Sequence, residues 1–311
     1  MLEPTVWRIH LKTEGRAFCS SVSKETPDYY KLFMFCREKG IIGVGWSKYS
    51  TRLEKEEDLR SHTPDTKSFK ALNAMRQMKA GDLIWTRSIK QVYYLCRVVK
   101  PWLDTVPDNE KHEYDIANFC EVEWLEIGTE DTVPGKVAAA FRPSAAIQRI
   151  HDVNLITRNL WNKYSGAALY PILATKAESV WDFLHSSQVE ELVLLYLQVN
   201  KGLRVYTSTV KHDEARFECI MVDSEGNLVY PQVKSGNTPL KSEEYRDIVE
   251  RDSSAMVYLF ASNQQYGVFQ HERINCITEG ELQEFIQHHM KLLPTITREW
   301  LRLYTELHQS W

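Results

Sequence analysis

The chain has 311 residues, of which 43% are hydrophobic, 26% charged and 11% aromatic, and its formal net charge at pH 7 is −4. This is a soluble globular composition with room for two domains, and no apolar run reaches the roughly 18 residues that a membrane span needs. The acidic balance gives no support to nucleic-acid binding over the whole surface, so a binding groove would have to be a local basic patch.

The N-terminus and the cysteines favour a cytoplasmic protein. The opening MLEPTVWRIHLKTEG has no apolar core of the kind that secretory signals carry. The six cysteines are scattered without C-x-x-C spacing, which argues against a zinc site or a disulfide framework and fits a reducing compartment.

The first half of the chain is typical of short strands interrupted by a few helices. The runs rich in Val, Ile, Tyr and Trp predict strands at 5–13, 40–46, 81–88, 92–102 and 120–128. Helical spacing with a glycine close to the end predicts helices at 26–40 and 68–82. This order predicts a small mixed β-barrel with helices, and we place the domain over residues 1–160, because a Pro-containing link and short helical material follow the last strand.

The second half has a different order of elements, which predicts an α/β domain over residues 161–311. A helix is expected at 178–202, where apolar residues share one face and Gly202 closes the end. The elements expected next are strands at 203–210, 216–222 and 228–236, a helix at 242–252, a strand at 255–262, and helices at 278–293 and 295–304. The order α-β-β-β-α-β indicates a hairpin that leads into a crossover helix.

Polar side chains occupy one face of the expected hairpin. Residues two apart in a strand share a face, so Gln232 and Lys234 point the same way, and a tight turn at 223–227 would bring Glu218 near Gln232. A carboxylate and an amide oxygen suit a hard cation such as Mg²⁺, or Mn²⁺ in its place, with water and substrate phosphate completing the ligands. The lysine could orient or deprotonate a water, or stabilise developing charge on the phosphate. A further carboxylate would come from Glu190 or Glu191 on the preceding helix.

The pattern over residues 176–262 resembles the PD-(D/E)xK nucleases, whose fold is that of restriction endonucleases. VEELVLLYLQ looks like the opening helix of that family, and PQVKSG looks like the Q-x-K form of its third strand, frequent in the Mrr-like branch. The resemblance implies Glu190 as the helix acid, and Glu218, Gln232 and Lys234 as strand acid, second ligand and catalytic lysine, with Glu190, Glu218 and Gln232 holding the metal.

Two departures from the family pattern leave alternatives open. Glu218 stands where aspartate is usual, and Gln232 replaces the commoner acid, so the metal would be bound more weakly and the domain could bind without cutting. Asp213 and Asp223 compete with Glu218 for the role of strand acid, and a lone Q-x-K is also common on solvated strand faces.

Residues 1–130 resemble the PUA-like superfamily, in particular EVE-type and YTH-like domains. The resemblance rests on GIIGVGWSKYS, MKAGDLIWTR, YYLCRVV and FCEVEWLEI, in that order along the chain. Such domains hold a flipped, modified base in an aromatic pocket, which implies Trp46 and Trp85 as pocket walls and Ser47 as an edge contact. The alternative is that these tryptophans belong to the core of the barrel.

Several other chemistries are excluded by the sequence. There is no G-x-x-x-x-G-K-[ST] loop, no G-x-G-x-x-G fingerprint in a βαβ context and no G-x-S-x-G elbow. His288 and His289 are adjacent on a helix, so they face different directions and make poor joint zinc ligands.

Together the two resemblances imply a modification-dependent DNA endonuclease of prokaryotic, anti-phage defence. The expected substrate is DNA carrying modified cytosine, hydrolysed with Mg²⁺, and breaking both strands would require a homodimer. The alternatives are a non-catalytic binder of modified nucleic acid with a degenerate nuclease domain, and a nuclease directed to RNA.

Overall fold

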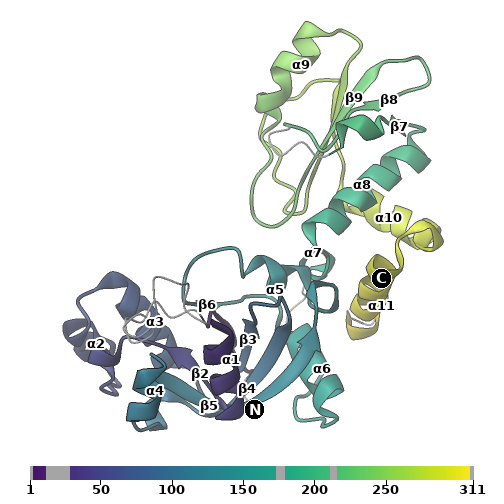
Figure 1. The fold of residues 1–311 in the computed structure, drawn as a ribbon. Helices are drawn as coiled ribbons and strands as arrows, with labels where there is room; N and C mark the ends of the chain where they lie inside the picture. Colours follow the sequence, from purple (N-terminus) through teal and green to yellow (C-terminus); the bar gives the residue numbers. More distant parts are fainter. Residues whose placement is uncertain (1–2, 12–28, 173–178, 211–215, 309–311) are drawn as a thin grey trace. The chain divides into compact units, whose positions relative to one another are not determined.

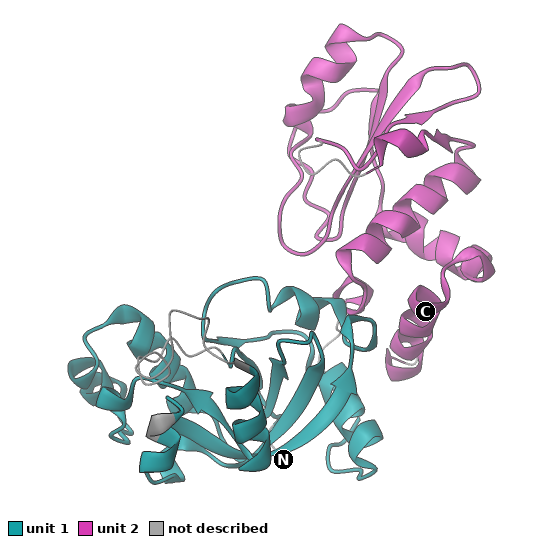
Figure 2. Ribbon diagram, viewed as in Figure 1, with its two compact units in different colours: residues 1–178 teal, residues 179–311 magenta. Residues whose placement is uncertain are grey.

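A computed structural model of the protein describes residues 3–11, 29–172, 179–210 and 216–308. The chain divides into two compact units, residues 1–178 and 179–311, which are described separately (Figure 2). The boundary expected at residue 160 falls inside α6 (Asn154–Ser165), which belongs to the first unit. Among the described residues, no helix is both long enough and apolar enough to cross a membrane.

The first unit is built on a curled six-stranded sheet (Figure 1). Its strands are β1 (Val6–Ile9), β2 (Ile41–Val44), β3 (Leu83–Arg87), β4 (Tyr93–Lys100), β5 (Asn118–Gly128) and β6 (Ile147–Arg149). They lie in the order β2-β5-β4-β3-β1-β6, with β1 and β3 parallel and the other neighbours antiparallel. Because the described pairings leave β2 and β6 at the two edges, the predicted small barrel is present only as a half-barrel.

Helices cover this sheet on both faces. They are α1 (Tyr29–Glu38), α2 (Glu56–His62), α3 (Thr66–Gln77), α4 (Asn109–Glu113), α5 (Gly135–Ala139) and α6, with 3-10 turns η2 (Ser47–Tyr49), η3 (Trp102–Asp104) and η4 (Glu130–Thr132). Helix α3 begins where the Asp65 carboxylate accepts the Ser68 backbone N–H (2.8 Å), and α6 ends at Gly166, whose φ of 70° is left-handed.

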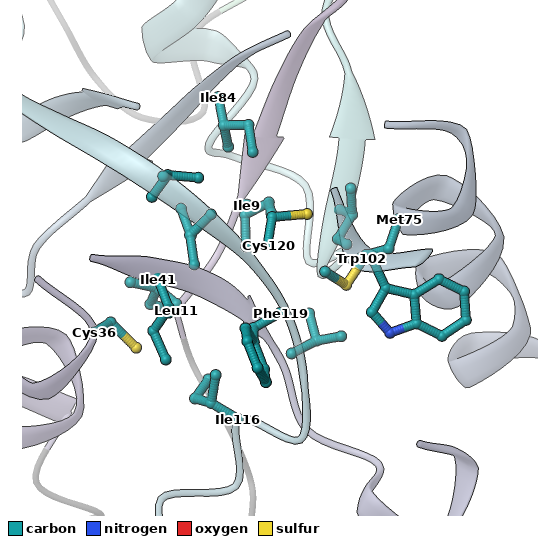
Figure 3. Close-up of a cluster of buried hydrophobic side chains, with 14 of the residues drawn as sticks. Ile9, Leu11, Cys36, Ile41, Met75, Ile84, Trp102, Ile116, Phe119 and Cys120 are labelled. Atoms are coloured by element: carbon teal, nitrogen blue, oxygen red, sulfur yellow. The ribbon is translucent and has the colours of Figure 1, made fainter. Parts of the chain in front are cut away.

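The larger core of the first unit lies on one face of the sheet. Ile9, Ile84 and Phe119 from three strands pack there with Met75 of α3 and Cys36 of α1 (Figure 3). The next residue of β3, Trp85, points to the other face, where its Nε1 donates to Thr157 Oγ1 of α6 (3.2 Å). Residues Leu83–Trp85 are fully buried because helices cover the sheet on both sides, which explains the unbroken apolar run at this strand.

Strands β2 and β5 approach each other closely at Gly43. A Cβ at Gly43 would lie 2.0 Å from the Asn118 carbonyl oxygen and 2.6 Å from the Phe119 Cα, both backbone atoms. Glycine is therefore required at this point of β2, since the facing backbone cannot rotate away as a side chain could.

The second unit is an α/β domain around a five-stranded sheet. Its strands are β7 (Arg204–Val205), β8 (Met221–Val222), β9 (Leu228–Lys234), β10 (Met256–Ala261) and β11 (Ile274–Cys276), in the order β11-β10-β9-β8-β7. Its helices are α7 (Val180–Phe183), α8 (Ser186–Asn200), α9 (Arg246–Arg251), α10 (Glu279–His289) and α11 (Thr295–His308), with 3-10 turns η5 (Thr207–Thr209), η6 (Ser242–Tyr245) and η7 (Met290–Leu292).

The predicted order α-β-β-β-α-β is confirmed, with β11 as an additional edge strand. Strands β7, β8 and β9 are antiparallel neighbours, and β9, β10 and β11 are parallel. Strands β7 and β8 are each only two residues long, much shorter than the sequence pattern predicts.

The two faces of this sheet are covered by different helices (Figure 1). Leu259 packs in a cluster with Tyr245 and with Val249 of α9. The next residue of β10, Phe260, has its ring 5.1 Å from that of Trp181 on α7, and α8 contacts β9. Residues of β9 that pair with Leu259 therefore share the α9 face, while those that pair with Phe260 face α7 and α8.

We expect Gly43→Ala to lower the free energy of unfolding by at least about 2 kcal/mol, because the new methyl group would force two backbones apart. Denaturant unfolding followed by tryptophan fluorescence measures this change. Gly280→Ala is the control, since no atom lies within 4 Å of the added Cβ, and alanine in α10 should leave stability equal or slightly higher. Wild-type stability in Gly43→Ala would contradict the close approach of β2 and β5.

Candidate functional site

A well-bonded turn sets the register of the β8–β9 hairpin. The Asp223 carboxylate accepts the backbone N–H groups of Glu225 (2.8 Å) and Asn227 (2.9 Å), and it also accepts the Asn227 side-chain amide (2.9 Å). The hydrogen bond from the Asn227 side chain is the main reason that the pKa of Asp223 is lowered. Asp223 therefore has a structural role in the turn, and the other alternative acid, Asp213, lies outside the described residues.

The register brings Glu218 and Gln232 together, as the sequence predicts. Met221 pairs with Val229, so residues three further from the turn on each strand lie opposite each other. The Glu218 backbone N–H donates to the Pro231 carbonyl (3.2 Å), which continues the pairing beyond β8. Gln232 Nε2 donates to Glu218 Oε1 (2.9 Å), and the Val233 backbone N–H donates to the same oxygen (3.3 Å).

The Gln232 amide is buried, with only 5% of the residue exposed. An ionised carboxylate can only accept hydrogen bonds, so the NH₂ group of Gln232 must face Glu218 and Oε1 must point away. Among the described residues, this buried Oε1 has no hydrogen-bond partner. An unsatisfied buried acceptor costs about 1–3 kcal/mol. A cation held by both residues would replace the hydrogen bond between them, with the Gln232 amide turned so that Oε1 faces Glu218.

Lys234 lies two residues beyond Gln232 on the same strand face, and its side chain is exposed. The end of β9 is held in place because the Lys234 carbonyl accepts the Ser262 backbone N–H (3.0 Å). An exposed ammonium next to a carboxylate and an amide is available to a phosphate or a water that comes from solvent.

Glu190 does not share the sheet face on which Gln232 lies. It is half-buried on α8, which contacts β9, whereas Gln232 pairs with Leu259 and therefore shares the face that α9 covers. Its neighbour Glu191 is exposed. The structure thus places Glu218, Gln232 and Lys234 on one strand face but does not place Glu190 there.

The chemistry of the hairpin is limited to oxygen ligands and an ammonium. Burial, with the charge of Glu218 as the smaller cause, raises the pKa of Cys219 to about 11, so this thiol stays protonated at neutral pH. In the described part of the chain, no three His, Cys, Asp or Glu side chains are grouped so that they could hold a metal ion. A cation at this hairpin would depend on Glu218, the Gln232 amide and waters.

The structure separates the two tryptophans predicted to line a base pocket. Trp85 is fully buried against α6, while Trp46 is half-buried and packs against the core on the other face of the sheet. Ser47 is exposed and begins η2. Only Trp46 and Ser47 are therefore available to a base; Trp85 belongs to the core, which was the alternative for these residues.

Trp46 has a strained backbone that neighbouring side chains hold in place. Its φ of 56° and ψ of 52° are left-handed, a conformation that costs a bulky residue about 1–3 kcal/mol and often marks a functional site. Asn118 Nδ2 donates to the carbonyls of Gly45 (2.7 Å) and Trp46 (3.3 Å), and Asn118 Oδ1 accepts from Trp102 Nε1 (3.0 Å).

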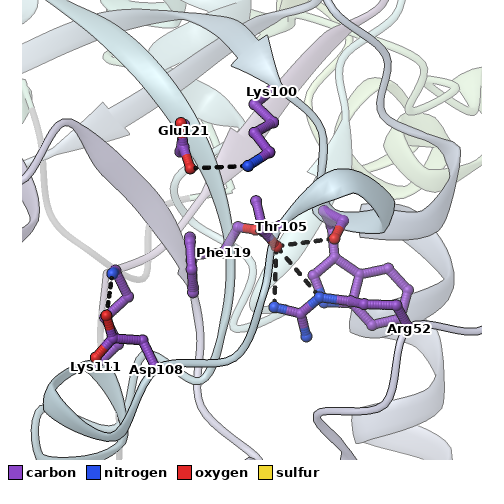
Figure 4. Close-up of polar contacts among 8 residues, drawn as sticks. Arg52, Lys100, Thr105, Asp108, Lys111, Phe119 and Glu121 are labelled. Atoms are coloured by element: carbon purple, nitrogen blue, oxygen red, sulfur yellow. Dashed lines mark hydrogen bonds and ion pairs between the residues drawn. The ribbon is translucent and has the colours of Figure 1, made fainter.

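Arg52 completes this support. Its guanidinium donates to Thr105 Oγ1 (3.0 and 3.2 Å; Figure 4). It also donates to Asn118 Oδ1 (3.1 Å) and lies 5.0 Å from the centre of the Trp102 ring. Burial lowers the pKa of Arg52 to about 10, so the group remains charged at neutral pH. Arg52 and Asn118 are not among the site residues predicted from the sequence, although an asparagine directly before the apolar Phe119 and Cys120 is a usable signal.

Asp115 is a second residue that the sequence analysis missed. All three atoms of its carboxyl group lie 2.5–2.6 Å from the position that a Cβ on Gly45 would take. Its φ of 52° is also left-handed, and burial raises its pKa from 3.8 to about 6. None of the hydrogen bonds between described residues includes this carboxylate, which is unusual for a half-buried charge.

A polar cavity of about 420 Å³ lies between α8 and α10, away from the predicted site residues. His288 and His289 contribute to its lining but are engaged separately: His288 Nδ1 lies 2.8 Å from the Glu284 carbonyl, and the His289 ring packs 4.9 Å from that of Phe285.

Comparisons of the chain with protein-family models, with curated proteins and with solved structures found no match. The features of this chain that bear on its function are therefore the geometry of the hairpin and of the region around Trp46.

The raised pKa of Asp115 gives a stability test with a definite sign. Between about pH 4 and pH 6 the unfolded chain loses this proton while the folded chain keeps it, so the free energy of unfolding falls as the pH rises through that window. We expect Asp115→Asn to be more stable than wild type by roughly 1–3 kcal/mol at pH 8, with a smaller difference at pH 4. Urea unfolding at several pH values measures this difference in the free energy of unfolding. Asp131→Asn, at an exposed position, is the control and should show no such trend.

Proposed function

We propose that the protein is a metal-dependent endonuclease that cuts DNA carrying a modified base, as prokaryotic defence enzymes do. The observation that carries the proposal is the Glu218–Gln232 pair, in which a buried amide lies 2.9 Å from a carboxylate and its oxygen has no hydrogen-bond partner in the described chain. This arrangement suits Mg²⁺ or Mn²⁺, which need few protein ligands when water and phosphate supply the others.

The roles of the residues follow from their chemistry. Glu218 and Gln232 would hold the cation, and Glu190 enters as a third ligand only through the resemblance to PD-(D/E)xK nucleases. The bound cation would supply charge stabilisation on the phosphate and a more acidic water. Lys234, exposed on the same strand face, would position the attacking water or balance the charge that develops on the phosphate.

The first unit would select the substrate. Trp46 offers a half-buried indole at the end of β2, and base stacking on an aromatic face contributes about 1–3 kcal/mol per base. One nuclease site breaks one strand, so cutting both strands would require two copies of the chain. The expected substrate is DNA with modified cytosine.

Replacement of the hairpin residues tests the nuclease proposal. We expect Glu218→Gln and Lys234→Met each to reduce Mg²⁺-dependent cleavage by at least about 100-fold, because each removes a charge that acts on the reacting phosphate. Cleavage is measured on unmodified, methylated, hydroxymethylated and glucosylated DNA, with RNA as a further substrate. Cleavage of RNA in place of DNA would support the RNA-directed alternative.

Matched substitutions separate a local effect from a general change in charge. Glu225→Gln and Lys241→Met remove the same charges at exposed positions of the same unit and should keep wild-type cleavage. Far-ultraviolet circular dichroism would verify that the hairpin variants are folded. Folded Glu218→Gln and Lys234→Met proteins that cut at the wild-type rate would refute this assignment of the site.

A second candidate is a non-catalytic binder of modified nucleic acid. It is favoured by the two hydrogen bonds that Glu218 Oε1 already accepts from Gln232 and Val233, which could serve only to join the strands. Calorimetry with Mg²⁺ and Mn²⁺ distinguishes the candidates: the nuclease should bind metal in a manner lost in Glu218→Gln, whereas the binder should bind DNA without metal.

A further inference from the structure

We infer that Asp115 determines which base the first unit accepts, by taking a hydrogen bond from the exocyclic amino group of a base stacked on Trp46. The inference rests on the proposed function, because it deepens the base-reading role of the same region. The ligand class that it names is a base with an amino group on its pairing edge, such as a modified cytosine or adenine.

The first argument is the position of the carboxylate. It fills the space beside Gly45 where any other residue would place its side chain, so the absence of a Cβ brings Asp115 directly next to the residue before Trp46. Both Trp46 and Asp115 have left-handed backbone conformations. Two strained non-glycine residues at one place indicate that the surrounding structure holds this geometry against an energetic cost.

The second argument is the unused hydrogen-bonding capacity. Asn118 Nδ2 donates to the carbonyls of Gly45 and Trp46, and the Arg52 guanidinium donates to Asn118 Oδ1 and to Thr105 Oγ1. None of these hydrogen bonds goes to Asp115. Burial raises the pKa of Asp115, because the carboxylate is partly removed from water where it lies against Gly45. A half-buried carboxylate that accepts no hydrogen bond from the described residues destabilises the free protein. A ligand that donates an N–H group to it would remove that cost.

The third argument is the chemistry of base edges. An ionised carboxylate accepts hydrogen bonds and donates none, so it matches the NH₂ group of cytosine or adenine. A keto oxygen at the same position, as in thymine or hypoxanthine, would face the carboxylate oxygen and be repelled. Selection of an amino group would leave the rest of the base free to carry a modification.

The test uses pairs of bases that differ only in this group. The probes are duplexes with one central base opposite an abasic site: 5-methylcytosine against thymine, 5-hydroxymethylcytosine against 5-hydroxymethyluracil, and adenine against hypoxanthine. Binding of the full chain is measured at pH 8, where Asp115 is ionised. We expect wild type to prefer the amino member of at least one pair by about tenfold or more, and the pair that responds identifies a pyrimidine or a purine ligand.

Two variants at the site should remove the preference by different routes. Asp115→Asn keeps the shape and tolerates a left-handed φ, but its amide can donate as well as accept, so the ratio should fall to within about threefold of unity. Gly45→Ala keeps the charge and displaces the carboxylate, and it should lower the ratio in the same way. Retention of the preference in folded Asp115→Asn would overturn the inference.

Trp46→Ala separates this inference from the proposed function. If Trp46→Ala weakens binding to modified probes while wild type shows no preference for amino groups, then the role given to Asp115 is wrong and base reading stands. If no probe shows binding that depends on Trp46, the base-reading proposal fails and the inference fails with it. The nuclease assignment is judged by the hairpin variants alone.

Discussion

The register of one antiparallel hairpin determines the candidate chemistry of the second unit. Asp223 holds the turn with three hydrogen bonds, Met221 consequently pairs with Val229, and Glu218 comes to lie opposite Gln232. A slip of one residue would turn Gln232 and Lys234 toward the other face, because side chains alternate along a strand. The amide–carboxylate pair and the ammonium beside it therefore depend on a turn that takes no part in the chemistry.

The first unit depends on a comparable constraint, the close approach of β2 to β5. Gly43 allows the two backbones to meet, Gly45 leaves space for the Asp115 carboxylate, and Asn118 holds the carbonyls of Gly45 and Trp46. In both units, well-bonded residues with no direct role position a polar group, the Gln232 amide oxygen or the Asp115 carboxylate, that makes no hydrogen bond to the described residues. Such unsatisfied groups are the physical reason for assigning a ligand to each place.

Sequence patterns predicted the hairpin side chains correctly but could not place the helix acid or the aromatic pocket. Strand alternation and a short turn are local properties, so the proximity of Glu218 and Gln232 follows from the chain itself. Whether Glu190 reaches the same face depends on how α8 packs across the sheet. Trp46 and Trp85 look alike in the sequence, yet β3 is covered on both faces and Trp85 is used to pack against α6.

The sequence by itself determined the order of elements, the α/β character of the second unit, the β-rich first unit and the cross-strand pair, because these depend on periodicity and turn residues. Only the tertiary structure decided that β2 and β6 lie at the two edges of the curled sheet in the described part of the chain. It also decided that the two tryptophans lie on opposite faces and that Asp115 lies against Gly45. The physical reason is the range of the interactions. Register and alternation act between neighbours in a hairpin, whereas burial, desolvation and close approach arise between segments that are far apart in the chain.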